Sequence, residues 1–244
     1  MLFSLFFDTM KHISYWPHHT GNRITFSERT LYMDSIIFDV DGTLWNSTEI
    51  VAKSWTEHLK TEGIFMEITS QKLMQLFGQL LPDIAKQLFP DYSEEEQLRL
   101  IDGCCQAEHE ALLKQCAPLY PGLESTLQAL CQRFPLFIVS NCQAGYIEVF
   151  LKATGFSKYF KGHLCPGDTG KDKAGNIRQI IEEYQLRSPV YVGDTMGDYN
   201  ACQKAEVPFI FASYGFGNVP DGTLRIQSLP DLLTLCSDMD ETMH

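Results

Sequence analysis

Four short runs of consecutive apolar residues place the strongest constraint on the fold of this chain. They are rich in Ile, Val, Phe and Tyr and occupy residues 35–40, 135–140, 189–193 and 207–212. Continuous apolar runs of this length are typical of strands that are covered on both faces. The later runs alternate with stretches whose apolar residues recur at steps of three or four, as on one face of a helix. Alternating strands and helices favour right-handed crossovers, so the sequence predicts an α/β fold with a parallel sheet.

A longer helical stretch over residues 47–118 interrupts this alternation between the first two runs. It contains no convincing strand, and two of its helix starts follow the capping-box spacing. In each, a residue that can cap a helix stands three positions before a glutamate: Asn46 before Glu49, and Ser93 before Glu96. We therefore expect a helical insert over residues 47–118, with the core formed by residues 33–46 and 119–244.

The first 32 residues show neither pattern. Residues 1–7 are apolar, but no positive charge precedes them and Asp8 ends the run, so they resemble neither a signal peptide nor a membrane span. Residues 11–32 have no helical or strand period, and we expect residues 1–32 to form a poorly ordered extension. Because Met33 stands directly before the first strand, we hypothesise that the functional chain starts there.

Charge and cysteine content exclude several classes of function. The chain carries 19 Lys and Arg against 31 Asp and Glu, for a net charge of −12, and contains no basic run. Binding to a nucleic-acid backbone depends on clustered positive charge, so no nucleic-acid partner is expected. The eight cysteines form no CxxC pair and are too irregular for a disulfide scaffold or a zinc site. They indicate reduced thiols, and we expect a cytoplasmic protein without a membrane partner.

Two carboxylates, Asp39 and Asp41, stand at the end of the first apolar run. Ionised carboxylates at such a position are costly unless a cation or hydrogen bonds stabilise them. A turn with Asp41 and Gly42 at its corner would account for these residues equally well. The pair by itself therefore indicates either a turn or a site.

Further polar residues follow the other apolar runs or open a helix: Ser140, Asn141, Lys173, Asp194 and Asp198. Each of them taken singly is explained as a helix cap or as a surface residue. Active sites of open parallel sheets, however, lie beyond the carboxyl ends of the strands, so we expect these side chains to converge. Carboxylate oxygens without His or Cys favour Mg²⁺, which often bridges protein carboxylates and a phosphate.

The strings DVDGTLW, IVSN, a lysine before a helix, and GDTMGD resemble, in this order, the four motifs of the haloacid dehalogenase superfamily. The resemblance covers about residues 34–212, and residues 118–130 resemble the entry to the second strand in its phosphoglycolate phosphatase-like branch. It implies a Rossmann-like, three-layer α/β/α core. It also implies that the helical insert is a small cap domain of the C1 type, which closes over the site.

The resemblance also implies roles for individual residues. Asp39 would be the nucleophile that attacks phosphorus and becomes an aspartyl phosphate. Asp41 would protonate the leaving alcohol and then activate water, and its presence disfavours the dehalogenating branches. Ser140, the backbone of Asn141, and Lys173 would hold the phosphoryl oxygens.

By the same resemblance, Mg²⁺ would be bound by the side chain of Asp39, the backbone carbonyl of Asp41 and the side chain of Asp194. Asp198 and Thr43 would support this site. The metal and a lysine are needed because an anionic nucleophile approaches an anionic phosphate only when the local charge is neutralised.

Two positions leave alternatives. The third motif has a lysine on either side of an aspartate, and we favour Lys173 over Lys171 because the apolar helical pattern that follows places it at the helix start. In the insert, Gly78, Gln79 and Leu80 resemble the loop that meets the leaving group. A turn between two helices would explain that loop without any substrate.

The resemblance implies a Mg²⁺-dependent phosphatase that hydrolyses a small phosphate monoester, such as phosphoglycolate or a sugar phosphate, as a monomer or homodimer. A hexose-phosphate mutase on the same scaffold is the nearest alternative, and a phosphonate-cleaving enzyme is a more distant one. A non-catalytic binding protein is also considered. Such proteins usually lose the nucleophile or the acid, whereas Asp39 and Asp41 are both present here.

Overall fold

The computed structural model describes residues 33–241 of the 244-residue chain. The extension expected over residues 1–32 lies outside the described residues, so its character and the hypothesis of a start at Met33 stay predictions. Met33 itself is buried against the core.

The described strands form one parallel sheet with the order β3-β2-β1-β4-β5-β6. The strands are β1 (Ser35–Phe38), β2 (Leu136–Val139), β3 (Phe160–Leu164), β4 (Pro189–Gly193), β5 (Phe209–Ala212) and β6 (Arg225–Ile226). The four predicted strands are β1, β2, β4 and β5, which occupy the interior of the sheet. The two edge strands were not predicted, because β3 carries Lys161, Gly162 and His163 and β6 has only two residues. Neither of these edge strands forms a continuous apolar run.

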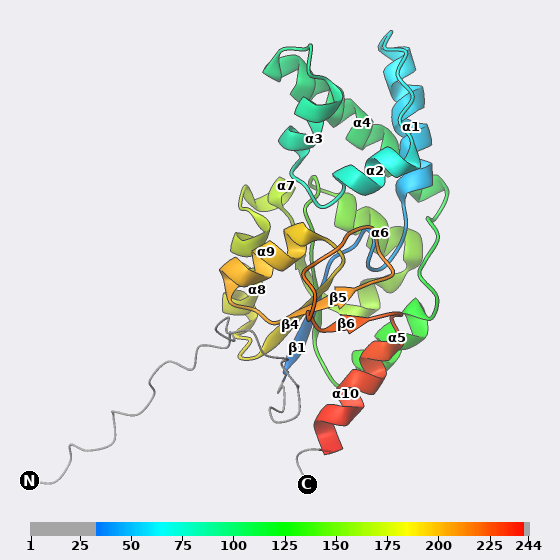
Figure 1. Cartoon of the computed structure of the whole chain (residues 1–244). Coiled ribbons are helices and arrows are strands. Elements are labelled where there is room, and N and C mark those ends of the chain that lie inside the picture. Colours follow the sequence, from blue (N-terminus) through cyan, green and yellow to red (C-terminus); the bar gives the residue numbers. More distant parts are fainter. Residues whose placement is uncertain (1–32, 242–244) are drawn as a thin grey trace, which may run out of the picture.

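Helices cover both faces of the sheet (Figure 1). One face packs on α8 (Lys173–Tyr184) and α9 (Met196–Ala205). The other packs on α5 (Leu123–Leu130), α6 (Tyr146–Thr154) and α10 (Asp231–Glu241). Successive residues of β1 alternate between these two cores, since Ile36 and Phe38 face one and Ile37 faces the other. The predicted three-layer α/β/α arrangement is therefore confirmed.

Four helices lie between β1 and α5 in the chain: α1 (Thr48–Thr61), α2 (Ser70–Leu76), α3 (Leu81–Leu88) and α4 (Glu94–Lys114). Figure 1 shows them beyond the carboxyl ends of the strands, with α1 alongside α4. They fall within the predicted helical insert, residues 47–118, and that name is kept for this segment. Its status as a separate domain with the predicted bounds stays a prediction.

The two predicted helix starts of the insert differ in outcome. Ser93 and Glu96 form the predicted capping box at the start of α4. The start of α1 has no such box, because Ser47 occupies the N-cap position and its side chain makes no capping hydrogen bond. The Asn46 side chain instead accepts hydrogen bonds from the backbone and hydroxyl of Thr48.

Two short segments complete the described structure, a 3₁₀ turn (Phe156–Tyr159) before β3 and α7 (Pro166–Thr169) after it. Within residues 33–241, no helix combines the length and the apolar character that crossing a membrane requires.

Candidate active site

Three neighbouring strands end at the edge of the sheet that faces the helical insert, and a predicted site residue follows each of them. Asp39 comes directly after β1, Ser140 directly after β2, and Asp194 directly after β4. β1 lies between the other two strands, and the strand order reverses direction there. Open α/β sheets bind their ligands at such a reversal. All three side chains are almost completely buried.

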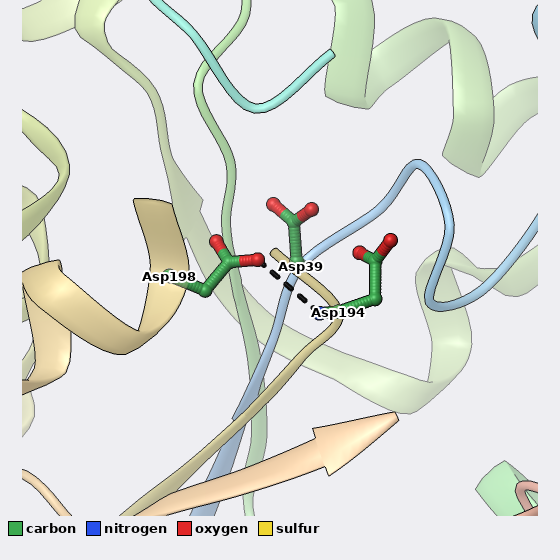
Figure 2. A group of neighbouring side chains, drawn as sticks. All are labelled: Asp39, Asp194 and Asp198. Carbon is green, nitrogen blue, oxygen red and sulfur yellow. Dashed lines mark hydrogen bonds between the residues drawn. The ribbon is translucent and has the colours of Figure 1, made fainter. Parts of the chain in front are cut away.

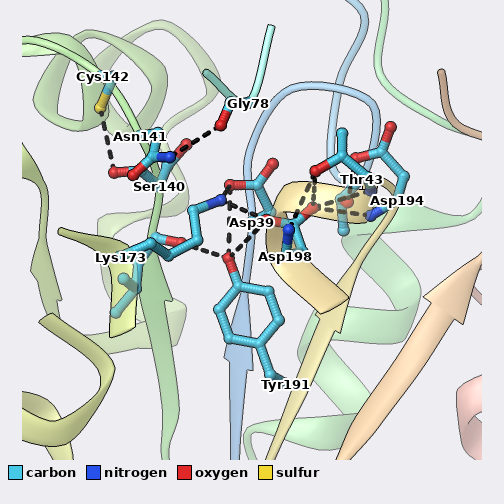
Figure 3. A network of polar contacts seen from close by, with 12 residues as sticks. Asp39, Thr43, Gly78, Ser140, Asn141, Cys142, Lys173, Tyr191, Asp194 and Asp198 are labelled. Atoms are coloured by element: carbon cyan, nitrogen blue, oxygen red, sulfur yellow. Dashed lines mark hydrogen bonds and ion pairs between the residues drawn. The ribbon is translucent and has the colours of Figure 1, made fainter. Parts of the chain in front are cut away.

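Lys173, the first residue of α8, lies between two buried carboxylates (Figure 3). Its ammonium group is 2.8 Å from Oδ1 of Asp39 and also contacts Oδ1 of Asp198. The hydroxyl of Tyr191 is 3.5 Å and 3.4 Å from the same two oxygens. Burial alone would lower the pKa of Lys173, but the charges of Asp198 and Asp39 outweigh it and hold the pKa above its usual value. Lys173 therefore carries a positive charge in this site.

Lys171, the alternative lysine, lies away from this network. Its side chain is exposed, and its ammonium group donates a hydrogen bond of 2.9 Å to Gln179. Of the two lysines in the motif, the structure brings only Lys173 to the nucleophile position.

Asp198 lies beside the other carboxylates, but hydrogen bonds already engage both of its oxygens. Oδ1 faces Lys173. Oδ2 accepts from the backbone N–H groups of Asp194 at 3.2 Å and Thr195 at 2.9 Å, and from the Thr195 hydroxyl at 2.7 Å. The Thr195 side chain in turn caps the backbone of Asp198, so that the pair forms a capping box at the start of α9. Asp198 thus positions Lys173 and the helix start.

Asp194 is held by two donors from separate loops. Its Oδ1 accepts a hydrogen bond of 3.2 Å from the Thr43 hydroxyl, and its Oδ2 accepts one of 2.7 Å from the backbone N–H of Phe216. The loop after β1 reaches Asp194 because residue 42 is glycine. Gly42 has φ 81°, and a β-carbon there would lie 2.1 Å from Oδ2 of Asp194.

The carboxylates of Asp39, Asp194 and Asp198 form a cluster in which one oxygen of each lies within 4.8 Å of the others (Figure 2). Burial raises the pKa of Asp39 to about 6, and the charge of Asp198 adds to this effect against the charge of Lys173. Burial, reinforced by Asp198 and Asp39, raises the pKa of Asp194 well above its usual value. A divalent cation would relieve this repulsion, and an all-oxygen donor set without His or Cys fits Mg²⁺.

Asp41 is oriented by two hydroxyl groups. Its Oδ1 accepts hydrogen bonds from Ser47 at 2.5 Å and from Tyr146 at 2.8 Å, and the Tyr146 hydroxyl is also 3.1 Å from that of Ser47. Loss of water around Asp41 raises its pKa to about 7, even though both hydrogen bonds act to lower it. No sequence pattern indicated either partner. Ser47 stands at a helix start, and Tyr146 lies on the apolar face of α6.

The helical insert reaches the site through Gly78, whose carbonyl accepts a hydrogen bond of 2.8 Å from the side chain of Asn141. Gly78 and Phe77 line the cavity above the carboxylates. Gln79 and Leu80, which were predicted beside Gly78, are not among the lining residues. The Gln79 side chain bonds within the insert, to Gln75 and Gln87, and Leu80 is the extended residue before α3.

The space between sheet and insert is a cavity of about 30 Å³, roughly the room that one water occupies. The sheet side and α6 contribute Asp39, Asp41, Ser140, Asn141, Cys142, Gln143 and Tyr146. The insert contributes Trp55, Phe77, Gly78, Leu81, Ile84 and Glu108. No sequence pattern indicated Trp55 or Glu108 as a site residue, because they lie on the apolar faces of α1 and α4.

Residues 36–212 match the family model described as haloacid dehalogenase-like hydrolase. The chain belongs to this family. The match covers the sheet from β1 to β5 with the helical insert, and the membership inferred from the four motifs is confirmed.

Several characterised relatives of this haloacid dehalogenase-like hydrolase are named as phosphatases. The chain is 27% identical over 193 residues to a phosphoglycolate phosphatase from Agrobacterium fabrum, covering 75% of this chain and 82% of that protein. It is 23% identical over 182 residues to the pyrophosphatase PpaX from Listeria innocua, covering 70% and 79%. Among solved structures, a predicted phosphatase from Clostridium acetobutylicum has a TM-score of 0.72 at 22% identity, covering 84% and 99%. The structural match shows the shared fold.

Proposed function

We propose that this protein is a Mg²⁺-dependent phosphatase that hydrolyses a small phosphate monoester through an aspartyl phosphate on Asp39. The observation that carries the proposal is the buried contact between Lys173 and Asp39, 2.8 Å long, within a cluster of carboxylates at the carboxyl ends of the strands. A lysine and a metal beside a nucleophilic carboxylate suit attack on an anionic phosphate. Relatives named as phosphoglycolate phosphatase and pyrophosphatase support phosphate chemistry.

Asp39 and Asp194 would hold Mg²⁺ through their carboxylates, with the backbone carbonyl of Asp41 as a third ligand. Asp198 would act through its contact with Lys173, since its Oδ1 faces that ammonium group and its Oδ2 already accepts three hydrogen bonds. Thr43 would hold Asp194 in place. When bound, the metal would neutralise part of the negative charge on the nucleophile and on the phosphate.

In the first step, a carboxylate oxygen of Asp39 attacks phosphorus, and the bond from phosphorus to the ester oxygen breaks. Asp41 gives its proton to that oxygen, which leaves as an alcohol. Its pKa of about 7 suits a group that is protonated in one step and ionised in the next. Lys173, the Ser140 hydroxyl and the Asn141 backbone stabilise the charge on the phosphoryl oxygens.

In the second step, water attacks the phosphorus of the aspartyl phosphate and gives a proton to Asp41. The bond between phosphorus and the Asp39 oxygen breaks, which releases inorganic phosphate and restores the carboxylate. Ser47 and Tyr146 keep the Asp41 carboxyl in one orientation through both steps. The helical insert would act as the cap, and its displacement would admit the ester, since the cavity is too small for one.

A phosphate-release screen over small phosphate esters with Mg²⁺ tests this function. The wild-type chain is expected to release phosphate, and Asp39→Asn is expected to lower kcat by about 1000-fold or more, because the amide is not a nucleophile. Asp102→Asn, a matched change on the exposed side of α4, is the control for the substitution itself. Equal activity of Asp39→Asn and wild type would overturn the mechanism.

A further inference from the structure

A buried carboxyl group from the helical insert lines the same cavity as Asp39 and Asp41. It belongs to Glu108 of α4, which is only 3% exposed. Its Oε2 accepts a hydrogen bond of 2.7 Å from the indole N–H of Trp55, and its Oε1 contacts the amide of Gln143. Both partners also line the cavity, and neither is charged. Within residues 33–241, the insert and the loop after β2 thus hold this carboxyl in place with no positive partner.

The described residues that line the cavity around Glu108 are uncharged or acidic. Among the described residues that line it there is no Lys, Arg or His. Lys173 forms ion pairs with the carboxylates of Asp39 and Asp198. His109 lies behind Gln143, 2.9 Å from its amide, and partial burial lowers the pKa of His109, which favours the neutral ring. The side-chain oxygen of Asn141 is buried and has no donor within the part of the chain that the structure describes.

This arrangement constrains the leaving group of a phosphate ester. A leaving group that carries a carboxylate would bring a negative charge into a cavity that is lined by three acidic side chains, Asp39, Asp41 and Glu108, and by no cationic residue among those described. A hydroxyl or ammonium group would supply the donor that the Asn141 oxygen lacks. The aromatic rings of Trp55 and Tyr146, which also line the cavity, are compatible with a cation.

We propose that Glu108 is a specificity-determining residue, which selects small alcohol phosphates bearing a hydroxyl or ammonium donor and disfavours those bearing a carboxylate. This inference rests on the proposed function and names its substrate class. Burial, against the hydrogen bonds from Gln143 and Trp55, raises the pKa of Glu108 to about 8. Glu108 therefore holds a proton at neutral pH, and a substrate ammonium beside it would take the place of that proton. A substrate carboxylate carries a negative charge and therefore cannot take the place of the proton on Glu108.

Three esters that differ only in their distal group test the inference: 2-hydroxyethyl phosphate, phosphoethanolamine and 2-phosphoglycolate. For the Mg²⁺-loaded wild-type protein, kcat/KM is expected to be about 10-fold or more higher for the first two than for 2-phosphoglycolate, the size of one buried polar contact. Glu108→Gln keeps the shape but cannot give up a proton to become an anion beside a substrate donor, so it is expected to narrow this ratio by about 10-fold. Glu110→Gln, an exposed matched change on the same helix, is expected to leave the ratio unchanged.

A wild-type preference for 2-phosphoglycolate, or equal kcat/KM for the three esters, would overturn the inference while leaving the proposed phosphatase function intact. An unchanged ratio in a folded Glu108→Gln protein would overturn the role of Glu108. Phosphate release from none of the esters, in this set or in the wider screen, would overturn both proposals. The wild-type comparison stands without any variant, so it decides the substrate class even if Glu108→Gln does not fold.

Discussion

At the scale of single residues, the site depends on how each carboxyl group is held. Asp39 faces an ammonium group, Asp194 accepts a hydroxyl and a backbone N–H, and Asp41 accepts two hydroxyls. Glu108 accepts only from neutral groups. These different surroundings give chemically identical or similar groups different tasks in the proposed reaction, because the stability of each charged form depends on its partners.

Tyr146→Phe removes one of the two hydroxyls that orient Asp41. We expect kcat for an alkyl phosphate to fall about 10-fold, because protonation of a poor leaving group needs a well-placed acid. The fall for p-nitrophenyl phosphate should be smaller, since its leaving group departs without a proton. Steady-state kinetics on both substrates measure the difference. Tyr184→Phe, on the exposed part of α8, is the control, and equal losses on both substrates would contradict a role through Asp41.

Glu108 makes the stability of the fold depend on pH. Its pKa of about 8 in the folded protein exceeds the ordinary value of 4.5, so the folded state keeps a proton that the unfolded chain loses between these values. Its contribution to the free energy of unfolding is therefore complete below about pH 4.5 and is lost as pH rises through about 8.

Glu108→Gln lacks this titration. Relative to wild type, we expect the variant to gain roughly 2 kcal/mol or more in free energy of unfolding between pH 5.5 and pH 8.5, since each pKa unit corresponds to about 1.4 kcal/mol. Urea denaturation at both pH values measures the gain, with Glu110→Gln as the control. A difference that is constant with pH would show that Glu108 titrates normally in the folded protein.

At the scale of elements, the loop between β1 and the helical insert is the tightest connection in the site. Its path beside Asp194 depends on Gly42, where positive φ and lack of space coincide. Gly63, at the end of α1, has a similar φ of 78° but no atom within 4 Å of the position of a β-carbon. Substitutions at the two glycines can therefore separate the energetic cost of positive φ from the cost of steric overlap.

Gly63→Ala is expected to lower the free energy of unfolding by about 1 kcal/mol, the cost of a left-handed conformation for an L residue. Gly42→Ala is expected to cost about 1–3 kcal/mol more, because its methyl group would overlap the Asp194 carboxylate. Urea denaturation of both variants beside wild type gives the comparison. If both substitutions lower the free energy of unfolding equally, the loop after β1 can move away from Asp194 without cost.

At the scale of the whole molecule, a cation bound by the carboxylate cluster would connect the loops that follow β1 and β4. The cluster of Asp39, Asp194 and Asp198 is buried under the insert, with the single ammonium of Lys173 against three carboxylates. The loop after β1 and the loop after β4 both begin in this cluster, at Asp39 and Asp194. A bound cation would therefore stabilise the edge of the sheet on which the insert lies.

Mg²⁺ is expected to raise the Tm of the wild-type protein by roughly 5–11 °C at about 100 times its Kd. Saturation by 100-fold corresponds to about 2.7 kcal/mol, and about 1 kcal/mol shifts the Tm of a domain of this size by roughly 2–4 °C. Asp194→Asn should abolish the rise and, without metal, should itself raise the Tm, because it removes buried repulsion. Differential scanning calorimetry, with KCl at equal ionic strength as the control, measures both effects. An equal rise in Asp194→Asn would place the ion elsewhere.

Much of the architecture could be predicted from the sequence, because it depends on local properties. The interior strands are continuous apolar runs, and the capping box of Ser93 and Glu96 starts α4 as its spacing predicts. The edge strands β3 and β6 could not be predicted, since strands that are partly exposed or very short need no apolar run. The capping box expected at Asn46 did not form, because tertiary contacts of the loop after β1 place Ser47 at the helix start.

The sequence by itself determined the parallel α/β fold, the position of the helical insert and the carboxylates at the strand ends, because apolar periodicity and motif order lie along the chain. Only the tertiary structure decided which groups meet. It brought Lys173 and not Lys171 to Asp39, placed Tyr146 on Asp41, and buried Glu108 against Trp55. These contacts join residues far apart in sequence, and their partners look like ordinary helix residues until packing sets the distance and the burial that give them a chemical role.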